Sequence, residues 1–258
     1  MSLFDLSGKV AVITGSSRGI GRAIAEAMAE QGAKVVISSR KIAACRATAD
    51  AINAVHGAGT AMACTANISS KDELKALVDA ARMEFGRIDV LVCNAASNPY
   101  YGPMADISDE QFRKIFDNNV LSNHWLIGMV APEMLERRDG SIIIISSIGG
   151  LTSSTVIGAY NVSKAADFQL ARNLAAEYGP FGVRVNCIAP GLVRTDFARA
   201  LWENPQTLEA VTAGSALRRI GEPHEIAGAA VYLAAPASAF TTGQAIIVDG
   251  GATIGVGL

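Results

Sequence analysis

Short apolar runs alternate with longer amphipathic stretches along most of this chain. Runs that are apolar throughout predict buried strands, and stretches whose apolar residues recur every three to four positions predict helices. The predicted strands are 9–13, 34–38, 60–65, 89–93, 141–146, 184–189 and 245–248. The predicted helices are 20–31, 41–56, 70–85, two around 108–136, 159–179 and 223–234.

This strict alternation predicts the fold class. Strands that are apolar on both faces and alternate with helices are typical of a parallel sheet covered on both sides. We therefore predict an α/β fold, a Rossmann-type doubly wound parallel sheet with helices on both faces. No linker, repeat or low-complexity tract interrupts the pattern, so residues 1–258 are expected to form a single domain.

One segment lacks this regularity and follows the strand 184–189. Its part from about 192 to 217 is the expected substrate lid, because four apolar residues recur there at roughly helical spacing and offer an apolar face. These residues are Phe197, Leu201, Trp202 and Leu208. Packing of the same face on the body or on a second subunit is the alternative.

Composition narrows the class of protein. Half of the 258 residues are hydrophobic and 18% are charged, so the chain can bury a large core. The 22 Lys and Arg residues against 24 Asp and Glu residues give a net charge of −2, which provides no basic field for nucleic acid. No apolar run approaches the ~18 residues of a membrane helix. We therefore expect neither a nucleic-acid nor a membrane partner.

Cysteine, histidine and the chain ends bear on metals and location. The cysteines lie far apart without a CxxC pair, and the histidines show no ligand spacing, so we expect no metal site and a reducing compartment. The N-terminus has no secretory signal pattern. The C-terminal Val256-Gly257-Leu258 lacks a Ser-Lys-Leu peroxisomal address, and we expect a cytoplasmic protein.

A glycine-rich turn, TGSSRGIG at 14–21, lies directly between the first strand and the first helix. Glycines there let a pyrophosphate approach the free N–H groups at a helix N-terminus, which indicates dinucleotide binding. The alternative is a tight turn whose glycines serve only the packing of the helix on the strand. The same letters match the GxSxG nucleophile elbow with Ser17, but that elbow does not normally open a chain, and neither His124 nor His224 suits a triad.

The residues at the end of the second strand predict which dinucleotide, NAD or NADP, the chain binds. Enzymes that prefer NAD usually carry an acid there to bond the ribose 2′-hydroxyl. Here Ser39 stands in that place and Arg40 follows it, with no acid nearby. Arg18 would approach a 2′-phosphate from the other side, and guanidinium groups suit a dianionic phosphate. These residues favour NADP(H), unless Arg40 is an ordinary solvated charge.

A serine, a tyrosine and a lysine form a candidate catalytic group. Tyr160 and Lys164 lie four residues apart on one helix face, and Ser147 follows a predicted strand. Carboxyl ends of parallel strands are where such sheets bind ligands. A phenol with a pKa of about 10 is a poor base at neutral pH unless a cation favours phenolate, and Lys164 can be that cation.

Across nearly its whole length the sequence resembles the short-chain dehydrogenase/reductases. The matching pieces are the turn at 14–21, Asn94-Ala95, Asn119-Val120, Ser147, Tyr160 with Lys164, Pro190-Gly191, Thr195 and Val248-Asp249-Gly250-Gly251. The segments 94–99, 190–192 and 218–223 look most like the NADP-dependent carbonyl and retinal reductases often found in peroxisomes.

The resemblance implies roles for individual residues. Ser147 would bond the substrate oxygen, Tyr160 would donate or remove its proton, and Lys164 would hold the nicotinamide ribose. The helix backbone at Asn119 would fix a water that links Lys164 to solvent. The residues placed at the cofactor are Gly15, Ser17, Arg18, Gly19, Ile20, Gly21, Ser39, Arg40, Asn67, Ile68, Asn94, Ala95, Tyr160, Lys164, Pro190, Gly191, Val193 and Thr195.

Two positions depart from the family pattern. Ala96 replaces the last glycine of the family's NNAG, and Asn67-Ile68 stand where many members carry Asp-Val beside adenine. Neither change touches the catalytic set.

The implied activity is hydride transfer between NADP(H) and a carbonyl or alcohol, with an uncharged hydrophobic substrate as the favoured class. The alternatives are reduction of 3-oxoacyl groups on a carrier protein or CoA, and a cofactor-binding regulator without catalysis. A carrier protein would need basic residues beside the site, for which Arg137 and Arg138 are available. The resemblance also implies a homotetramer, since the helices around 108–136 and 159–179 carry apolar residues on more than one face.

Overall fold

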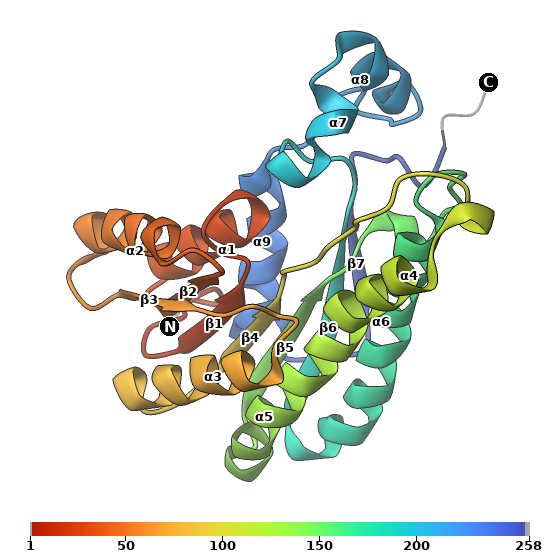
Figure 1. The fold of residues 1–258 in the computed structure, drawn as a ribbon. Coiled ribbons are helices and arrows are strands. Elements are labelled where there is room, and N and C mark those ends of the chain that lie inside the picture. Colours follow the sequence, from red (N-terminus) through yellow and green to blue (C-terminus); the bar gives the residue numbers. More distant parts are fainter. Residues whose placement is uncertain (1, 256–258) are drawn as a thin grey trace.

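A seven-stranded parallel sheet forms the centre of the computed structural model, which describes residues 2–255 (Figure 1). The strand order is β3-β2-β1-β4-β5-β6-β7. The strands are β1 (Val10–Thr14), β2 (Lys34–Ser39), β3 (Ala61–Thr65), β4 (Val90–Cys93), β5 (Gly140–Ile145), β6 (Val183–Pro190) and β7 (Ala245–Val248). The fold class predicted from the sequence is therefore confirmed, and each predicted strand is present within one or two residues of its expected ends.

Helices connect the strands and cover both faces of the sheet (Figure 1). They are α1 (Gly19–Glu30), α2 (Ile42–His56), α3 (Lys71–Phe85), α4 (Asp109–Phe116), α5 (Ser122–Arg137), α6 (Gly158–Tyr178), α7 (Arg199–Trp202), α8 (Pro205–Thr212) and α9 (Pro223–Ala234). One apolar layer packs α1, α2 and α9 against the sheet, and the other packs α3, α5 and α6. Burial of both faces explains why the central strands are apolar throughout.

Local signals in the sequence set the helix ends. The Ser70 hydroxyl accepts a hydrogen bond from the Glu73 N–H at the start of α3, and Gly86 ends that helix with a φ of 80°. Ser108 and Gln111 form a reciprocal capping box at the start of α4. Such caps satisfy backbone groups that have no partner inside the helix.

Two parts of the chain differ from the sequence-based expectation. The helices around 108–136 are joined by a five-residue π-helical turn, η2 (Asp117–Leu121), which periodicity alone does not reveal. The irregular segment after β6 contains the short helices α7 and α8, which protrude from the body at the top of Figure 1.

The segment 194–220 is a loop whose two ends meet. Val193 and Gly221 form an isolated parallel bridge, the Arg194 N–H donates to the Gly221 carbonyl at 2.9 Å, and the Gly221 N–H donates to the Leu192 carbonyl at 3.0 Å. We call this excursion the lid loop. It coincides with the predicted lid within a few residues, and its role as a lid remains a proposal.

Two further expectations concern membranes and the chain end. Within residues 2–255, no helix is long and apolar enough to cross a membrane. The C-terminal Val256-Gly257-Leu258 lies outside the described residues.

Candidate active site

The strand order reverses between β1 and β4, and ligands of such sheets bind beyond the carboxyl ends of the strands at this point. The glycine turn follows β1 and Asn94 follows β4. The Asn94 side-chain amide donates to the carbonyls of Thr14 at 2.8 Å and Gly15 at 3.1 Å. The Thr14 hydroxyl accepts from the backbone N–H groups of Asn94 and Ala95. The two loops are therefore fixed against each other.

Two glycines make this packing possible. Gly15 has a φ of 65°, a conformation that side chains rarely adopt. A Cβ on Gly21 would lie 2.5 Å from the Asn94 amide nitrogen and 2.6 Å from the Gly15 carbonyl oxygen. The turn thus needs glycine for its packing against the loop that carries Asn94, and the approach of a pyrophosphate stays a prediction.

The N-terminus of α1 has the character of an anion site. Arg18 at the N-cap forms no side-chain cap hydrogen bond, and the first turn contains no acidic residue. The first N–H groups of the helix and its dipole therefore favour an anion from outside the helix. A Cβ on Gly19 would lie 3.3 Å from the Thr195 methyl group, so the beginning of the lid loop borders this helix end.

The residues predicted for the 2′-phosphate lie at the ends of β2 and of the glycine turn. Ser39 is the last residue of β2, and its hydroxyl lies 3.1 Å from the Cys45 sulfur. Arg40 is exposed. The Arg18 guanidinium donates to the Asp196 carboxylate of the lid loop at 2.8 Å. The structure therefore pairs Arg18 with an acid that the sequence analysis did not consider.

The predicted catalytic residues come from β5 and α6. Ser147 follows β5, and its hydroxyl oxygen accepts the Gly149 N–H at 3.0 Å. The Ser146 hydroxyl donates to the Lys164 carbonyl at 2.8 Å, and a Cβ on Gly150 would lie 2.7 Å from the Lys164 carbonyl carbon. The segment after β5 therefore lies directly on the part of α6 that carries Lys164.

Tyr160 and Lys164 project from α6 and are buried. The Lys164 ammonium lies 5.7 Å from the centroid of the Tyr160 ring. Phe197 of the lid loop tilts over that ring, with centroids 5.9 Å apart, and is itself 58% exposed. The lid loop thus brings an apolar side chain to the tyrosine.

Lys164 is 2% exposed and has two acceptors in the described chain. Its ammonium donates to the Ile145 carbonyl at 2.9 Å and to the Asp167 carboxylate at 3.1 Å. Burial alone would lower the pKa of Lys164, but the Asp167 carboxylate, its hydrogen bond and smaller contributions from Tyr160 and Cys187 together raise that pKa above its usual value. Lys164 is therefore an ammonium at neutral pH.

Asn119 lies in the π-helical turn and is fully buried. Its side-chain amide donates to the Ser163 hydroxyl at 3.0 Å and to the Ser97 carbonyl at 3.1 Å, and its side-chain oxygen accepts the Ser97 N–H. Its backbone carbonyl accepts the Asn123 side chain at 2.6 Å. The residue therefore connects α6, the loop after β4 and the next turn of its own helix.

The remaining predicted cofactor residues border the same edge of the sheet. Asn67 and Ile68 follow β3, and the Asn67 side-chain oxygen accepts the Ser69 N–H at 3.2 Å. Pro190 ends β6, and Gly191 packs so closely that a Cβ would lie 2.8 Å from the Asp249 Cα. Val193 is buried and Thr195 is half-buried.

Three comparisons place the chain among known proteins. A family model described as enoyl-(acyl carrier protein) reductase matches residues 15–253. Dehydrogenase/reductase SDR family member 4 of Bos taurus is 41% identical over 248 residues, which cover 95% of this chain and 88% of that protein. The chain belongs to the short-chain dehydrogenase/reductase family.

Solved structures of this family superimpose closely. A 7α-hydroxysteroid dehydrogenase complexed with NADH and 7-oxo glycochenodeoxycholic acid has a TM-score of 0.92 at 37% identity, covering 96% of each chain. A gluconate 5-dehydrogenase from Burkholderia cenocepacia in complex with NADP and tartrate has a TM-score of 0.93 at 30% identity, covering 98% of each chain. The short-chain dehydrogenase/reductase family comprises oxidoreductases that use a nicotinamide cofactor, so the family predicted from the sequence is confirmed.

Within this family site, sequence reasoning missed Asp167 and Asn123. Asp167 is fully buried, and its carboxylate contacts the Lys164 ammonium and accepts the Asn123 side chain at 3.2 Å. The available signal was an acid three residues after the lysine on a helix whose neighbouring positions are apolar. The contact with Asn123 has no such signal, because it joins two helices.

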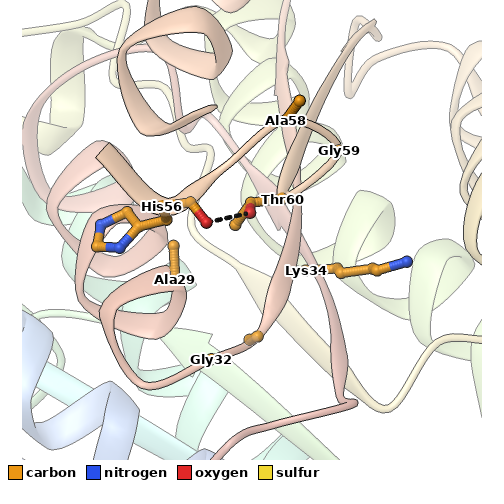
Figure 2. A pocket seen from close by; sticks show the side chains of 8 residues that line it. Ala29, Gly32, Lys34, His56, Ala58, Gly59 and Thr60 are labelled. Atoms are coloured by element: carbon orange, nitrogen blue, oxygen red, sulfur yellow. Dashed lines mark hydrogen bonds between the residues drawn. The ribbon is translucent and has the colours of Figure 1, made fainter. Parts of the chain in front are cut away.

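Other polar features lie at the opposite, amino-terminal edge of the sheet. One shallow hollow of about 360 Å³ is lined by eight residues, and Figure 2 shows that its His56 and Lys34 side chains point away from each other. Arg137 donates to the Ile88 carbonyl and Arg138 to the Pro180 carbonyl, at the beginnings of β4 and β6. The expectation that these arginines lie beside the site is therefore wrong for a single chain.

Proposed function

We propose that this protein transfers a hydride between NADP(H) and a carbonyl or secondary alcohol. The observation that carries the proposal is the packing of the Ser147 segment on α6 beside Tyr160 and Lys164, at the sheet edge that also holds the glycine turn. The N-terminus of α1, which has no side-chain cap and no acid in its first turn, fits a dinucleotide pyrophosphate.

In this proposal the bound cofactor supplies the hydride, and the chain supplies positions and a proton. Ser147 donates a hydrogen bond to the substrate oxygen, and Tyr160 gives that oxygen its proton in reduction or takes it in oxidation. Lys164 keeps a positive charge near the phenol and holds the nicotinamide ribose. Asn119 and the polar groups around it connect Lys164 to the interior of the π-helical turn.

The preference for NADP(H) rests on the end of β2. Ser39 occupies the position of the carboxylate that would accept the ribose 2′-hydroxyl, and Arg40 is exposed beside it. The relatives with NADH and with NADP show that this family accommodates both cofactors. We therefore expect Ser39 and Arg40 to determine which of the two this chain prefers. Arg18 can contribute once its guanidinium turns from Asp196 toward the phosphate.

The test is kcat/KM for one ketone with NADPH and with NADH. Because charge-assisted hydrogen bonds contribute about 1.5–3 kcal/mol each, we expect at least a tenfold preference for NADPH. Ser39→Asp with Arg40→Ala should reverse the preference, and Lys41→Ala serves as a control for a general loss of positive charge. Equal efficiency with NADH in the unmodified protein refutes the preference, and absence of turnover with both cofactors favours a non-catalytic regulator.

We further propose an uncharged hydrophobic substrate, because Phe197 borders Tyr160 and Trp202 packs under Arg194 in the lid loop. The 7-oxo glycochenodeoxycholic acid in the structure of one relative is a ketone, but it also carries a carboxyl group, so it supports a ketone substrate and not the absence of charge. Reduction of 3-oxoacyl groups is the second candidate. A panel of cyclic and aromatic ketones beside a 3-oxoacyl-CoA separates the two.

A homotetramer and a cytoplasmic location complete the proposal. Phe116 of α4 is half-buried, and Leu121 of the π-helical turn and Val162 of α6 are exposed. A partner subunit would cover these side chains. Light scattering should give about four times 26.8 kDa at micromolar concentration, and a particle of one chain mass refutes the tetramer. Fractionation of cells tests the location.

A further inference from the structure

Lys164 has a buried anionic neighbour whose role the proposed proton transfer leaves open. The Asp167 carboxylate is fully buried one helical turn after Lys164, with one oxygen 3.1 Å from the ammonium. Its second oxygen accepts the Asn123 side chain at 3.2 Å. A buried carboxylate is costly unless it is paired and hydrogen-bonded, and this one is both.

Asn123 links this ion pair to the π-helical turn. A side-chain amide has two N–H groups, and here the Asn123 nitrogen donates to the Asn119 carbonyl at 2.6 Å and to Asp167. A continuous set of contacts therefore leads from the Asn119 backbone through Asn123 and Asp167 to the Lys164 ammonium.

The contacts of Lys164 leave one N–H free. An ammonium has three donors, and in the described residues 2–255 the Ile145 carbonyl and the Asp167 carboxylate take one each. Two fixed acceptors restrict rotation of the group, so the third N–H has a fixed direction. In the proposed function that third N–H serves the ribose.

We propose that Asp167, held by Asn123, is a positioning residue that keeps Lys164 charged and directs its remaining N–H toward the cofactor. Asp167 touches neither substrate nor cofactor in this proposal, and it acts through Lys164 alone. The expected effect on turnover rests on the proposed function. The expected effect on the Kd of the nucleotide requires only that the protein binds the cofactor.

Other titratable groups face the lysine. Tyr160 contributes from α6, Cys187 from β6 and Cys93 from β4. Burial raises the pKa of both thiols far above neutrality, so they stay uncharged at pH 7. Asp167 is therefore the group that offsets the cost of burying the ammonium. Burial also raises the pKa of Asp167, and the Lys164 ammonium and the Asn123 amide lower it in part.

Replacement of the Asp167 carboxylate should change the pKa of Lys164 in a definite direction. Burial favours the neutral amine, so loss of the opposite charge lowers the pH at which Lys164 gives up its proton. In Asp167→Asn the amine should become neutral within the range where the unmodified protein still carries an ammonium.

The first measurement is the Kd of NADPH, with NADH in parallel, from pH 7 to pH 9.5 by cofactor fluorescence. This readout needs no turnover. We expect a nearly constant Kd for the unmodified protein and about a tenfold weakening across the range for Asp167→Asn, because a charge-assisted hydrogen bond is lost. The matched control is Asp89→Asn, which removes a buried, ion-paired carboxylate from the other edge of the sheet. Its Kd should stay constant although its Tm falls.

The second measurement is the pH profile of alcohol oxidation. The basic limb for Asp167→Asn should move to lower pH, because Lys164 loses its proton at lower pH in that variant, and the basic limb of Asp89→Asn should not move. If the unmodified protein binds nucleotide but turns over no alcohol or ketone, the proposed function fails and the binding curves alone decide this inference.

A flat Kd curve for folded Asp167→Asn, or an unmoved basic limb in an active protein, overturns the proposal. If Asp167→Asn does not fold, Asn123→Ala replaces it. That variant keeps the carboxylate and removes the bond that holds it, so Kd should weaken about threefold over the same pH range. A curve for Asn123→Ala that superimposes on the unmodified one overturns the proposal equally.

Discussion

Buried charges at the two edges of the sheet differ in the number of partners that surround them. At the amino edge, the Asp89 carboxylate accepts the Val10 N–H at 3.0 Å and lies within 4 Å of three cations, Lys9, Arg87 and Arg137. At the carboxyl edge, the Lys164 ammonium has one carboxylate and one carbonyl. The Asp89 carboxylate has several partners inside the chain, whereas one N–H of the Lys164 ammonium has no acceptor among residues 2–255.

This difference separates stability from function. Groups whose hydrogen-bonding capacity is used up inside the chain contribute to folding, and groups with capacity left can bind something else. The loops follow the same division. At the amino edge, several connections turn at glycines with positive φ, such as Gly32, Gly86 and Gly182. At the carboxyl edge, the connections after β4, β5 and β6 are long and carry Asn94, Ser147 and the lid loop.

The strongest test of this contrast uses two tyrosines. Tyr160→Phe should lower kcat by 10²–10⁴-fold with NADPH binding almost intact, because one positioned proton donor is lost. Tyr232→Phe removes a hydroxyl that lies 2.8 Å from the Thr241 hydroxyl far from the site. It should leave kcat unchanged and cost about 1 kcal/mol of unfolding free energy. Retention of half the normal kcat in Tyr160→Phe would refute the assignment.

A second test uses two glycines and has a smaller expected effect. A Cβ on Gly21 would lie 2.5 Å from the Asn94 amide, so Gly21→Ala must displace one of the two loops. Overpacking of this kind costs about 1–3 kcal/mol, and we expect the Kd of NADPH to rise at least tenfold. Gly228 in α9 has open space around it, and Gly228→Ala should stabilise the protein by up to about 1 kcal/mol at constant Kd. Kd values that rise equally in both variants would contradict the assignment of the turn.

The smallest effect concerns Asp196. The Arg199 and Arg18 guanidinium groups lower its pKa, so it remains a carboxylate that competes with a phosphate for Arg18. Both partners are well exposed, so solvent screens the pair and its contribution is small. Asp196→Ala should therefore strengthen NADPH binding up to about fivefold at low salt and leave NADH binding unchanged. Equal changes for the two nucleotides would show that Arg18 does not meet the 2′-phosphate.

The sequence revealed those features that depend on short stretches of chain. Period, length and glycine placement predicted all seven strands and the turn at 14–21, because each is set by residues close together in sequence. Tyr160 and Lys164 share a helix, and their spacing alone placed them on one face.

Features that join distant segments could not be found in this way. Arg18 meets Asp196 across 178 positions, and Asn123 meets Asp167 across 44, so neither contact leaves a local pattern. The π-helical turn at 117–121 results from packing against α6 and the loop after β4, and its residues read as ordinary helix. The helices α7 and α8 are too short for a periodicity to be recognised.

The meeting of the lid loop's ends at Val193 and Gly221 has an evolutionary consequence. A segment that leaves and re-enters the body at one point can be exchanged for another of different length without disturbance of any strand. Recombination between related genes at these two codons would therefore transfer the whole lid loop, which we propose to face the substrate, in one event. We expect related proteins to diversify their substrates mainly through replacement of residues 194–220, while the rest of the chain changes little.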